Sequence, residues 1–242
     1  MIVVAGVTGA ILFMPAVYFL GLWLAPPRPV PATTHVPPIL SEALWARADG
    51  GRATELEPLN PISFVKHRIC RAIAARTDDP KLRAERRAEC MKQLPAVQAA
   101  DYLSGVHMRD QHVDPSSFRM GIGQFATAAW LTRSWTKAEL IDTLAARGEF
   151  EFDWRGVDAA ARGYFGRDVR GLQLPQAALL AGLIGDRATD PWCDSGAALS
   201  IRHRILERML DNFAIDDATF RAADASPIDL GPPPAGHNPC HT

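Results

Sequence analysis

The chain of 242 residues begins with an uncharged apolar stretch over residues 2–24. As a helix, this stretch would be about 34 Å long at ~1.5 Å per residue, which is enough to cross a bilayer. Tyr18 and Trp23 lie toward its C-terminal end, where an aromatic belt is expected. A cleaved signal peptide is the alternative, but the stretch is long, no basic segment precedes it and the sequence after Trp23 is a poor cleavage site. We therefore predict a transmembrane anchor over residues 1–25.

Two further segments are set apart by proline and glycine. Residues 26–38 contain six prolines, and such a sequence is extended and semi-rigid. We expect it to be a stalk that holds the following domain off the membrane. Residues 226–242 are rich in proline and glycine and are predicted to be an irregular tail.

Between these segments the pattern is helical. Apolar residues recur three and four positions apart over residues 39–45, 62–75, 81–94 and 124–132. Thr136 and Glu139 have the spacing of a capping box, which predicts a helix that ends near Gly148. Residues 174–183 are almost wholly apolar, which predicts a buried central helix. No segment alternates with a period of two. The pattern thus predicts one all-α domain over residues 39–225.

Net charge and cysteine content limit the partners and the metal sites that the chain could have. The net charge is −1, which gives no indication of a nucleic-acid partner. The four cysteines lack C-x-x-C spacing, which argues against a zinc site. They are Cys70, Cys90, Cys193 and Cys240. Outside the cytoplasm an antiparallel helix pair would place Cys70 opposite Cys90, and Cys240 would tie the tail to Cys193. Four buried free thiols are the alternative.

A run of motifs between Lys137 and Leu206 carries a family resemblance. It contains Lys137-Ala-Glu-Leu-Ile141, Gly156-Val-Asp-Ala-Ala-Ala-Arg-Gly-Tyr-Phe-Gly166, Leu172-Gln-Leu-Pro-Gln-Ala-Ala-Leu-Leu-Ala-Gly182, Asp190-Pro191-Trp192 and Arg202-His203-Arg204-Ile205-Leu206. In order and spacing, the run resembles the C-terminal half of the peptidoglycan glycosyltransferase domain, family 51, of monofunctional transglycosylases and class A penicillin-binding proteins. The resemblance implies a lysozyme-like all-α fold behind one membrane helix. It also implies a bacterial inner-membrane location, single-pass, with the domain on the periplasmic side.

The resemblance also implies a reaction that joins two lipid-linked disaccharides. A glutamate is the base toward the acceptor hydroxyl, and cations stabilise the departing diphosphate. That glutamate lies in a motif whose best match is residues 43–49, where Ala48 occupies its position and Asp49 is retained. Asp49, Glu55 or Glu57 could act as a substitute base. A carboxylate shifted by one residue on a helix points about 100° away, so Asp49 is equally an ordinary helix-end carboxylate.

Other family motifs are altered in a similar way. The donor-binding motif aligns with residues 98–110, where Gln98 is retained and Arg109 falls at the phosphate-binding lysine. Gln124 stands where the second glutamate is expected, and an amide hydrogen-bonds but carries no charge. Arg119 matches the arginine upstream of that glutamate with a slip of one residue, and Lys137 is the retained lysine. The alternative for Arg109 is an ordinary surface arginine.

Three functions are consistent with these observations. The first is a membrane-anchored, catalytically impaired glycosyltransferase-like protein that binds a peptidoglycan precursor, a glycan strand or a cell-wall protein. The second is an active, divergent transglycosylase, and the third is a structural component of an envelope complex. No cofactor is expected, and a divalent metal is expected only for an active enzyme.

Overall fold

The computed structural model describes residues 15–53, 55–59, 70, 73, 76, 82, 96–235, 237 and 240. The chain divides into two compact units, and each is described by itself. Unit 1 comprises Met1–Val30 and Glu55–Thr136, and unit 2 comprises Pro31–Thr54 and Lys137–Thr242.

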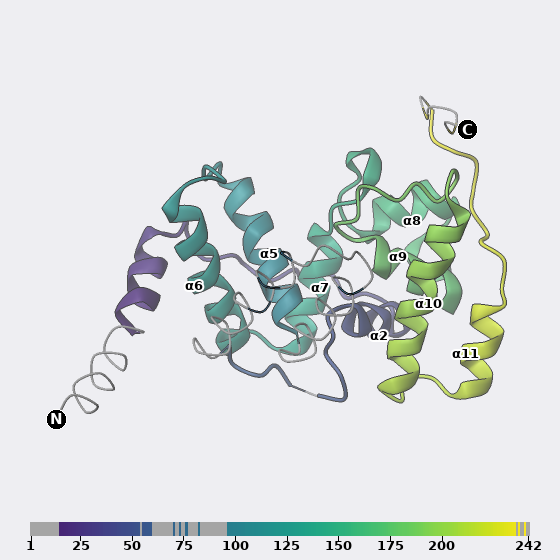
Figure 1. Ribbon diagram of the computed structural model, residues 1–242, viewed down its shortest axis with the longest axis horizontal. Coiled ribbons are helices and arrows are strands. Elements are labelled where there is room, and N and C mark those ends of the chain that lie inside the picture. The colour runs from purple at the N-terminus through teal and green to yellow at the C-terminus, as the bar shows by residue number, and fades with distance from the viewer. Residues whose placement is uncertain are drawn as a thin grey trace. The chain divides into compact units, whose positions relative to one another are not determined.

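Unit 1 is built on two long helices that pack against each other, α5 (Val97–Asp110) and α6 (Phe118–Ser134) (Figure 1). Apolar side chains of both helices are buried, among them Leu103, Val106 and Leu131. Residues 15–24 form a further helix. Gly21 lets this helix approach α6 closely, because a Cβ at Gly21 would lie 2.6 Å from the Cβ of Ala126. Unit 1 therefore brings the helix at residues 15–24 directly onto α6.

The helices of unit 1 differ from the predicted ones at two points. α6 begins six residues before the predicted 124–132 segment, because the Ser117 side chain accepts a hydrogen bond from the Met120 amide and caps the helix. α5 was not among the helices predicted from the pattern, since polar side chains such as Ser104 and His107 are buried in it. The predicted helices over 62–75 and 81–94 lie outside the described residues, apart from isolated positions.

Unit 2 is a cluster of helices around α9 (Leu174–Leu183), which contacts α2 (Pro38–Arg47), α8 (Val157–Phe165), α10 (Ser195–Asp211) and α11 (Asp217–Asp224). α9 has the predicted bounds, and its buried residues include Leu179, Leu180 and Leu183. α7 (Lys137–Arg147) follows Thr136 as predicted. Figure 1 shows α10 between α9 and α11. The predicted buried central helix is thus confirmed.

A loop closed by aromatic side chains connects α7 to α8. It holds the short 3-10 helix η1 (Glu151–Asp153), while a second one, η2 (Val169–Gly171), follows α8. The loop is pinned by an isolated antiparallel bridge between Glu149 and Arg155. The rings of Trp154 and Tyr164 pack edge to face with their centres 4.9 Å apart. This is a favourable arrangement for two aromatic rings. This cluster fixes the loop that follows Gly148, where the preceding helix was predicted to end.

The proline-rich segment lies against protein and does not stand free as the stalk prediction expected. In unit 1 the Pro27 carbonyl is 2.7 Å from His107 Nε2, and the Arg28 guanidinium lies 5.3 Å from the centre of the Trp130 ring. In unit 2 the Asp142 carboxylate binds the ring of His35 and the amide of Val36. Buried polar partners therefore hold the segment at both ends.

The described residues contain helices and irregular segments but no strand, which confirms the all-α prediction for this part of the chain. None of the helices in the described ranges is long and apolar enough to cross a membrane. The first fourteen residues of the predicted anchor lie outside those ranges.

Candidate functional site

The candidate site in unit 1 is centred on Gln124 of α6. Its side-chain nitrogen donates to two oxygens of Asp101 on α5, the carboxylate Oδ1 at 3.0 Å and the backbone carbonyl at 3.1 Å. Both bonds are partly buried. The amide of Gln124 is therefore oriented by Asp101, a residue that the sequence analysis did not single out.

Gln98 and Arg109 lie on the same stripe of α5 as Asp101. Positions 98, 101, 105 and 109 are three or four residues apart, so they share one face of the helix. Gly105 leaves room for two side chains on this face: a Cβ there would lie 3.2 Å from Gln124 Nε2 and 3.5 Å from Arg109 Nη1. Gln124 and the exposed Arg109 therefore both lie over Gly105.

Arg119 is placed differently. Its Nε donates to the carbonyl of Leu24 at 2.6 Å, which ties α6 to the end of the helix over residues 15–24. Arg119 and Gln124 are five residues apart on α6, so their side chains point about 140° apart. The structure therefore gives Arg119 a partner at the N-terminal helix and not beside Gln124.

Ala48 and Asp49 belong to unit 2, at the end of α2. Ala48 has no exposed surface. Asp49 has a positive φ of 51°, and its Oδ1 lies 3.0 Å from Arg208 Nη1 in α10. The same Arg208 nitrogen also lies 3.3 Å from the carbonyl of Arg47. Asp49 is thus a helix-end carboxylate that forms an ion pair with Arg208.

The remaining predicted residues are similarly placed by local contacts. Lys137 Nζ lies 4.4 Å from the centre of the Trp45 ring and 3.9 Å from Glu42 Oε1, so it packs on α2. Glu55, like Glu57, is exposed in unit 1. Each unit therefore holds part of the predicted set: Gln98, Arg109, Arg119, Gln124 and Glu55 lie in unit 1, and Ala48, Asp49 and Lys137 lie in unit 2.

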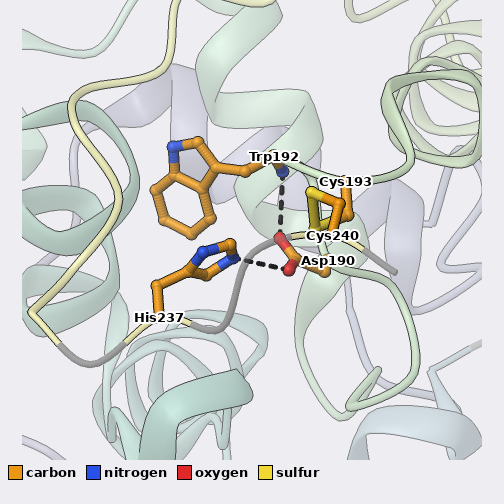
Figure 2. Close-up of a disulfide and its surroundings, with 5 residues drawn as sticks. All are labelled: Asp190, Trp192, Cys193, His237 and Cys240. Atoms are coloured by element: carbon orange, nitrogen blue, oxygen red, sulfur yellow. Dashed lines mark hydrogen bonds and ion pairs between the residues drawn. A yellow bond between two sulfur atoms is a disulfide. The ribbon is translucent and has the colours of Figure 1, made fainter. Parts of the chain in front are cut away.

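The tail of unit 2 is fastened by cysteine. A disulfide joins Cys193 to Cys240, with a Cα–Cα distance of 5.1 Å; this is the pairing expected for a protein outside the cytoplasm. Cys70 is also disulfide-bonded, and Cys90 lies outside the described residues. Figure 2 shows the Cys193–Cys240 bond beside Asp190, Trp192 and His237.

A second polar cluster in unit 2 was missed by the sequence analysis. His203 Nδ1 lies 2.9 Å from Asp224 Oδ1, and this hydrogen bond raises the pKa of His203. Both residues line a cavity of about 630 Å³, together with Asp186, Thr189, Ala197 and Ser200. Arg202 beside them is 1% exposed and donates to the backbone carbonyls of Asp224 and Ser226. The cluster anchors the C-terminal segment on α10.

The chain is similar to known proteins in sequence. The family described as Transglycosylase matches residues 102–210. Penicillin-binding protein 1A of Vibrio cholerae serotype O1 is 35% identical over 94 residues, which cover 38% of this chain and 11% of that protein. Biosynthetic peptidoglycan transglycosylase of Acinetobacter baumannii (strain ATCC 17978) is 30% identical over 96 residues, covering 39% of this chain and 43% of that protein.

Among solved structures, penicillin-binding protein 1A from Haemophilus influenzae aligns with 39% of this chain and 14% of its own, at 29% identity and a TM-score of 0.37. The chain thus spans less than half the length of each relative. The matched segment runs from within α5 to the end of α10 and includes Arg109, Arg119, Gln124 and Lys137. The resemblance seen in the motifs is confirmed: residues 102–210 match the Transglycosylase family, and the similar proteins are class A penicillin-binding proteins and biosynthetic peptidoglycan transglycosylases.

Proposed function

We propose that this protein is a catalytically impaired peptidoglycan glycosyltransferase homologue that binds the lipid-linked precursor, or the glycan strand made from it. The observation that carries the proposal is the double hydrogen bond from the Gln124 amide to Asp101. These bonds fix the orientation of a neutral side chain at the position that the family resemblance aligns with an acid.

The impairment follows from the chemistry of the first base. Activation of an acceptor hydroxyl needs an ionised carboxylate within hydrogen-bond reach. Ala48 has no group that exchanges a proton, and its side chain is fully buried. The neighbouring Asp49 is paired with Arg208 at 3.0 Å, so this carboxylate is already engaged by a cation. Neither residue therefore offers the base that the reaction requires.

Binding is retained in this proposal because the cation of the donor site is present. Arg109 is exposed on the α5 stripe, and its guanidinium lies over Gly105 as the Gln124 amide does. A guanidinium matches phosphate geometry with two parallel hydrogen bonds, and it remains charged at any physiological pH. A diphosphate linked to a lipid and a sugar is the ligand that this stripe suits best.

We further propose that the protein is a single-pass inner-membrane protein with its domain in the periplasm. The apolar stretch over residues 2–24 supports an anchor, and large apolar side chains on unit 1 support contact with lipid. Phe19, Trp23 and Phe118 are 66%, 79% and 74% exposed, and aromatic residues are enriched where protein meets the membrane surface. The Cys193–Cys240 disulfide fits an oxidising compartment.

The experiment combines polymerisation with binding. Detergent-solubilised full-length protein is given fluorescent lipid-linked disaccharide pentapeptide and a divalent metal, with the Acinetobacter baumannii biosynthetic transglycosylase as the active control. We expect no glycan from this protein but measurable binding of the precursor. Arg109→Ala should weaken binding at least tenfold, since a charge-assisted hydrogen bond contributes about 1.5–3 kcal/mol. Arg204→Ala removes an exposed cation from α10 and should leave binding unchanged.

Two results would contradict the proposal. Glycan made by the wild-type protein would show that a base is present and that the chain is an active transglycosylase. Absence of precursor binding, or equal loss in the Arg109 and Arg204 variants, would show that the α5 stripe does not hold a diphosphate. Co-purification of an envelope protein by such a non-binding protein would then favour the structural role.

A further inference from the structure

Four residues with metal-binding side chains meet at the C-terminal tail of unit 2. Single ligand atoms of Asp190, Cys193 and His237 all lie within 4.8 Å of one another. Cys240 joins them through its disulfide with Cys193. Figure 2 shows that His237 and the disulfide flank the Asp190 carboxylate, with His237 Nε2 at 2.7 Å from Asp190 Oδ2. The set offers one carboxylate, one imidazole and two sulfurs.

The sequence spacing of these residues is paired. Asp190 and Cys193 are three residues apart, and so are His237 and Cys240. Two ligand pairs, each with two residues between its members, are typical of tetrahedral structural zinc sites. The search for C-x-x-C spacing misses this arrangement because each pair contains one cysteine and one residue of another type.

Backbone hydrogen bonds already hold the first pair in a suitable turn. The carbonyl of Asp190 accepts from the amides of Cys193 at 3.1 Å and Asp194 at 2.8 Å, and Asp190 Oδ1 accepts from the amide of Trp192 at 3.0 Å. The Trp192 and Phe152 rings lie 5.5 Å and 5.8 Å from the imidazole of His237. His237 of the second pair therefore packs against two aromatic rings, one of them from the turn that holds the first pair.

We propose that Asp190, Cys193, His237 and Cys240 form a redox-gated zinc site. In the oxidised protein the two sulfurs are bonded to each other, and this disulfide fastens the C-terminal tail. A dithiol reductant that opens this bond becomes a disulfide itself and leaves two thiols on the protein. Zn²⁺ then binds both sulfurs as thiolates, together with His237 Nε2 and a carboxylate oxygen of Asp190. The two thiol protons are released, and the zinc ion keeps its oxidation state.

The exchange needs movements of about 2 Å or less. With metal–ligand distances of about 2.0–2.3 Å, ligand atoms around tetrahedral zinc lie roughly 3.3–3.8 Å apart. The two atoms that now share a 2.7 Å hydrogen bond, in His237 and Asp190, would thus separate by about 0.6 Å, and the two sulfurs, about 2.0 Å apart in a disulfide, by about 1.8 Å. Cys193 and Cys240 are exposed, so a reductant can reach the bond between them. The mixed sulfur and nitrogen ligand set favours zinc over the hard cations, which prefer oxygen. Zinc would keep the tail fastened once the covalent link is open.

The test is a zinc titration of the full-length protein in detergent, oxidised or reduced with dithiothreitol and desalted without oxygen, against a chromophoric chelator. We expect the reduced protein to bind one equivalent of Zn²⁺ at least 100-fold more tightly than the oxidised protein does. Co²⁺ in place of zinc should give the visible bands of a tetrahedral site and a thiolate charge-transfer band. His237→Ala and Asp190→Asn should each weaken zinc binding at least tenfold, whereas His112→Ala, at an exposed histidine of unit 1, should not.

The Cys193→Ser/Cys240→Ser variant retains Cys70 and Cys90, so it reports any zinc bound by those cysteines. The proposal is overturned if the reduced wild-type protein binds no more tightly than this variant, or no more tightly than the oxidised protein. It is also overturned if the cobalt complex of the wild-type protein lacks tetrahedral bands, a result that does not depend on any variant being folded.

Discussion

Gln124 and Asp101 are joined by two hydrogen bonds that come from a single nitrogen, one to a carboxylate oxygen and one to the backbone carbonyl of the same residue. A side-chain amide suits this position because it brings donors to an anion without adding charge. A glutamate side chain has nearly the same shape, but its carboxylate would face that of Asp101. The α5–α6 interface is therefore matched to a neutral residue at position 124.

Gln124→Glu is expected to destabilise the protein by about 1–3 kcal/mol at pH 7, because both hydrogen bonds are lost and two carboxylates face each other. Their repulsion raises the pKa of the new glutamate above its ordinary value. Since the pKa is higher in the folded protein than in the unfolded one, the cost is largest at neutral pH and shrinks as the pH falls and the group is protonated. Thermal unfolding at pH 7 and pH 5 measures this.

The matched control is Gln124→Met, which loses the hydrogen bonds without adding a charge and should show a loss of stability independent of pH. Adding Asp101→Ser to Gln124→Glu removes the opposing carboxylate and should recover part of the loss. A Gln124→Glu variant as stable as the wild type at pH 7 would contradict the matched interface.

Arg202→Ala is expected to destabilise unit 2 by about 2–4 kcal/mol, because buried carbonyl groups lose their donors. Arg202 is 1% exposed and donates to the carbonyls of Asp224 and Ser226, which end α11. Denaturant unfolding measures the change. Arg204→Ala, two residues along the same helix but exposed, should stay within about 0.5 kcal/mol of the wild type. Equal effects in the two variants would contradict the anchoring role.

Gly163→Ala is expected to cost about 1–3 kcal/mol, although alanine is the better helix former. A Cβ at Gly163 would lie 2.3 Å from an atom of the Trp154 ring, and that ring is held by Tyr164 in the aromatic cluster. Gly196→Ala is the control in α10, where the nearest atom would be at an ordinary 3.5 Å. It should cause no loss. Thermal melting followed by tryptophan fluorescence separates the two variants, and similar melting temperatures would contradict the close approach.

The ion pair of His203 predicts a pH dependence of stability. The hydrogen bond to Asp224 raises the pKa of His203, so the stability it provides is fully present below the unfolded pKa of about 6.5 and is lost as the pH rises through the folded pKa. The His203 side chain is 43% exposed, so we expect the gain over Asp224→Asn to be under about 1 kcal/mol at pH 6. It should vanish by pH 9.

The substitution preserves the bond of Arg202, which goes to the backbone carbonyl of Asp224. Proton NMR titration of the His203 ring provides an independent check: its pKa should fall toward the ordinary histidine value in Asp224→Asn. An unchanged pKa would exclude Asp224 as the cause.

The sequence pattern predicted the structure best where the residues of one helix determine that helix without distant partners. The bounds of α9 were predicted because residues 174–183 are almost wholly apolar; in the structure Pro175 and a capping box from Gln173 begin this helix. α5 was missed, since its buried face contains Ser104 and His107, whose partners are distant in sequence. The bond between Asp101 and Gln124 depends on the register of two helices, and no local pattern carries that information. The motifs of α8 to α10 pointed to the family because their spacing is unbroken.

Under the proposed function, the burial of Ala48 has a consequence for the evolution of this protein. A single nucleotide change can turn an alanine codon into a glutamate codon, so reversion of Ala48 to glutamate is genetically simple. Yet the longer, charged side chain would have to be accommodated where no surface is open, at the helix end that Arg208 closes. A revertant would lose folding stability before it gained any activity that selection could favour. The lost base is thereby entrenched, and its return requires prior change in the residues around it.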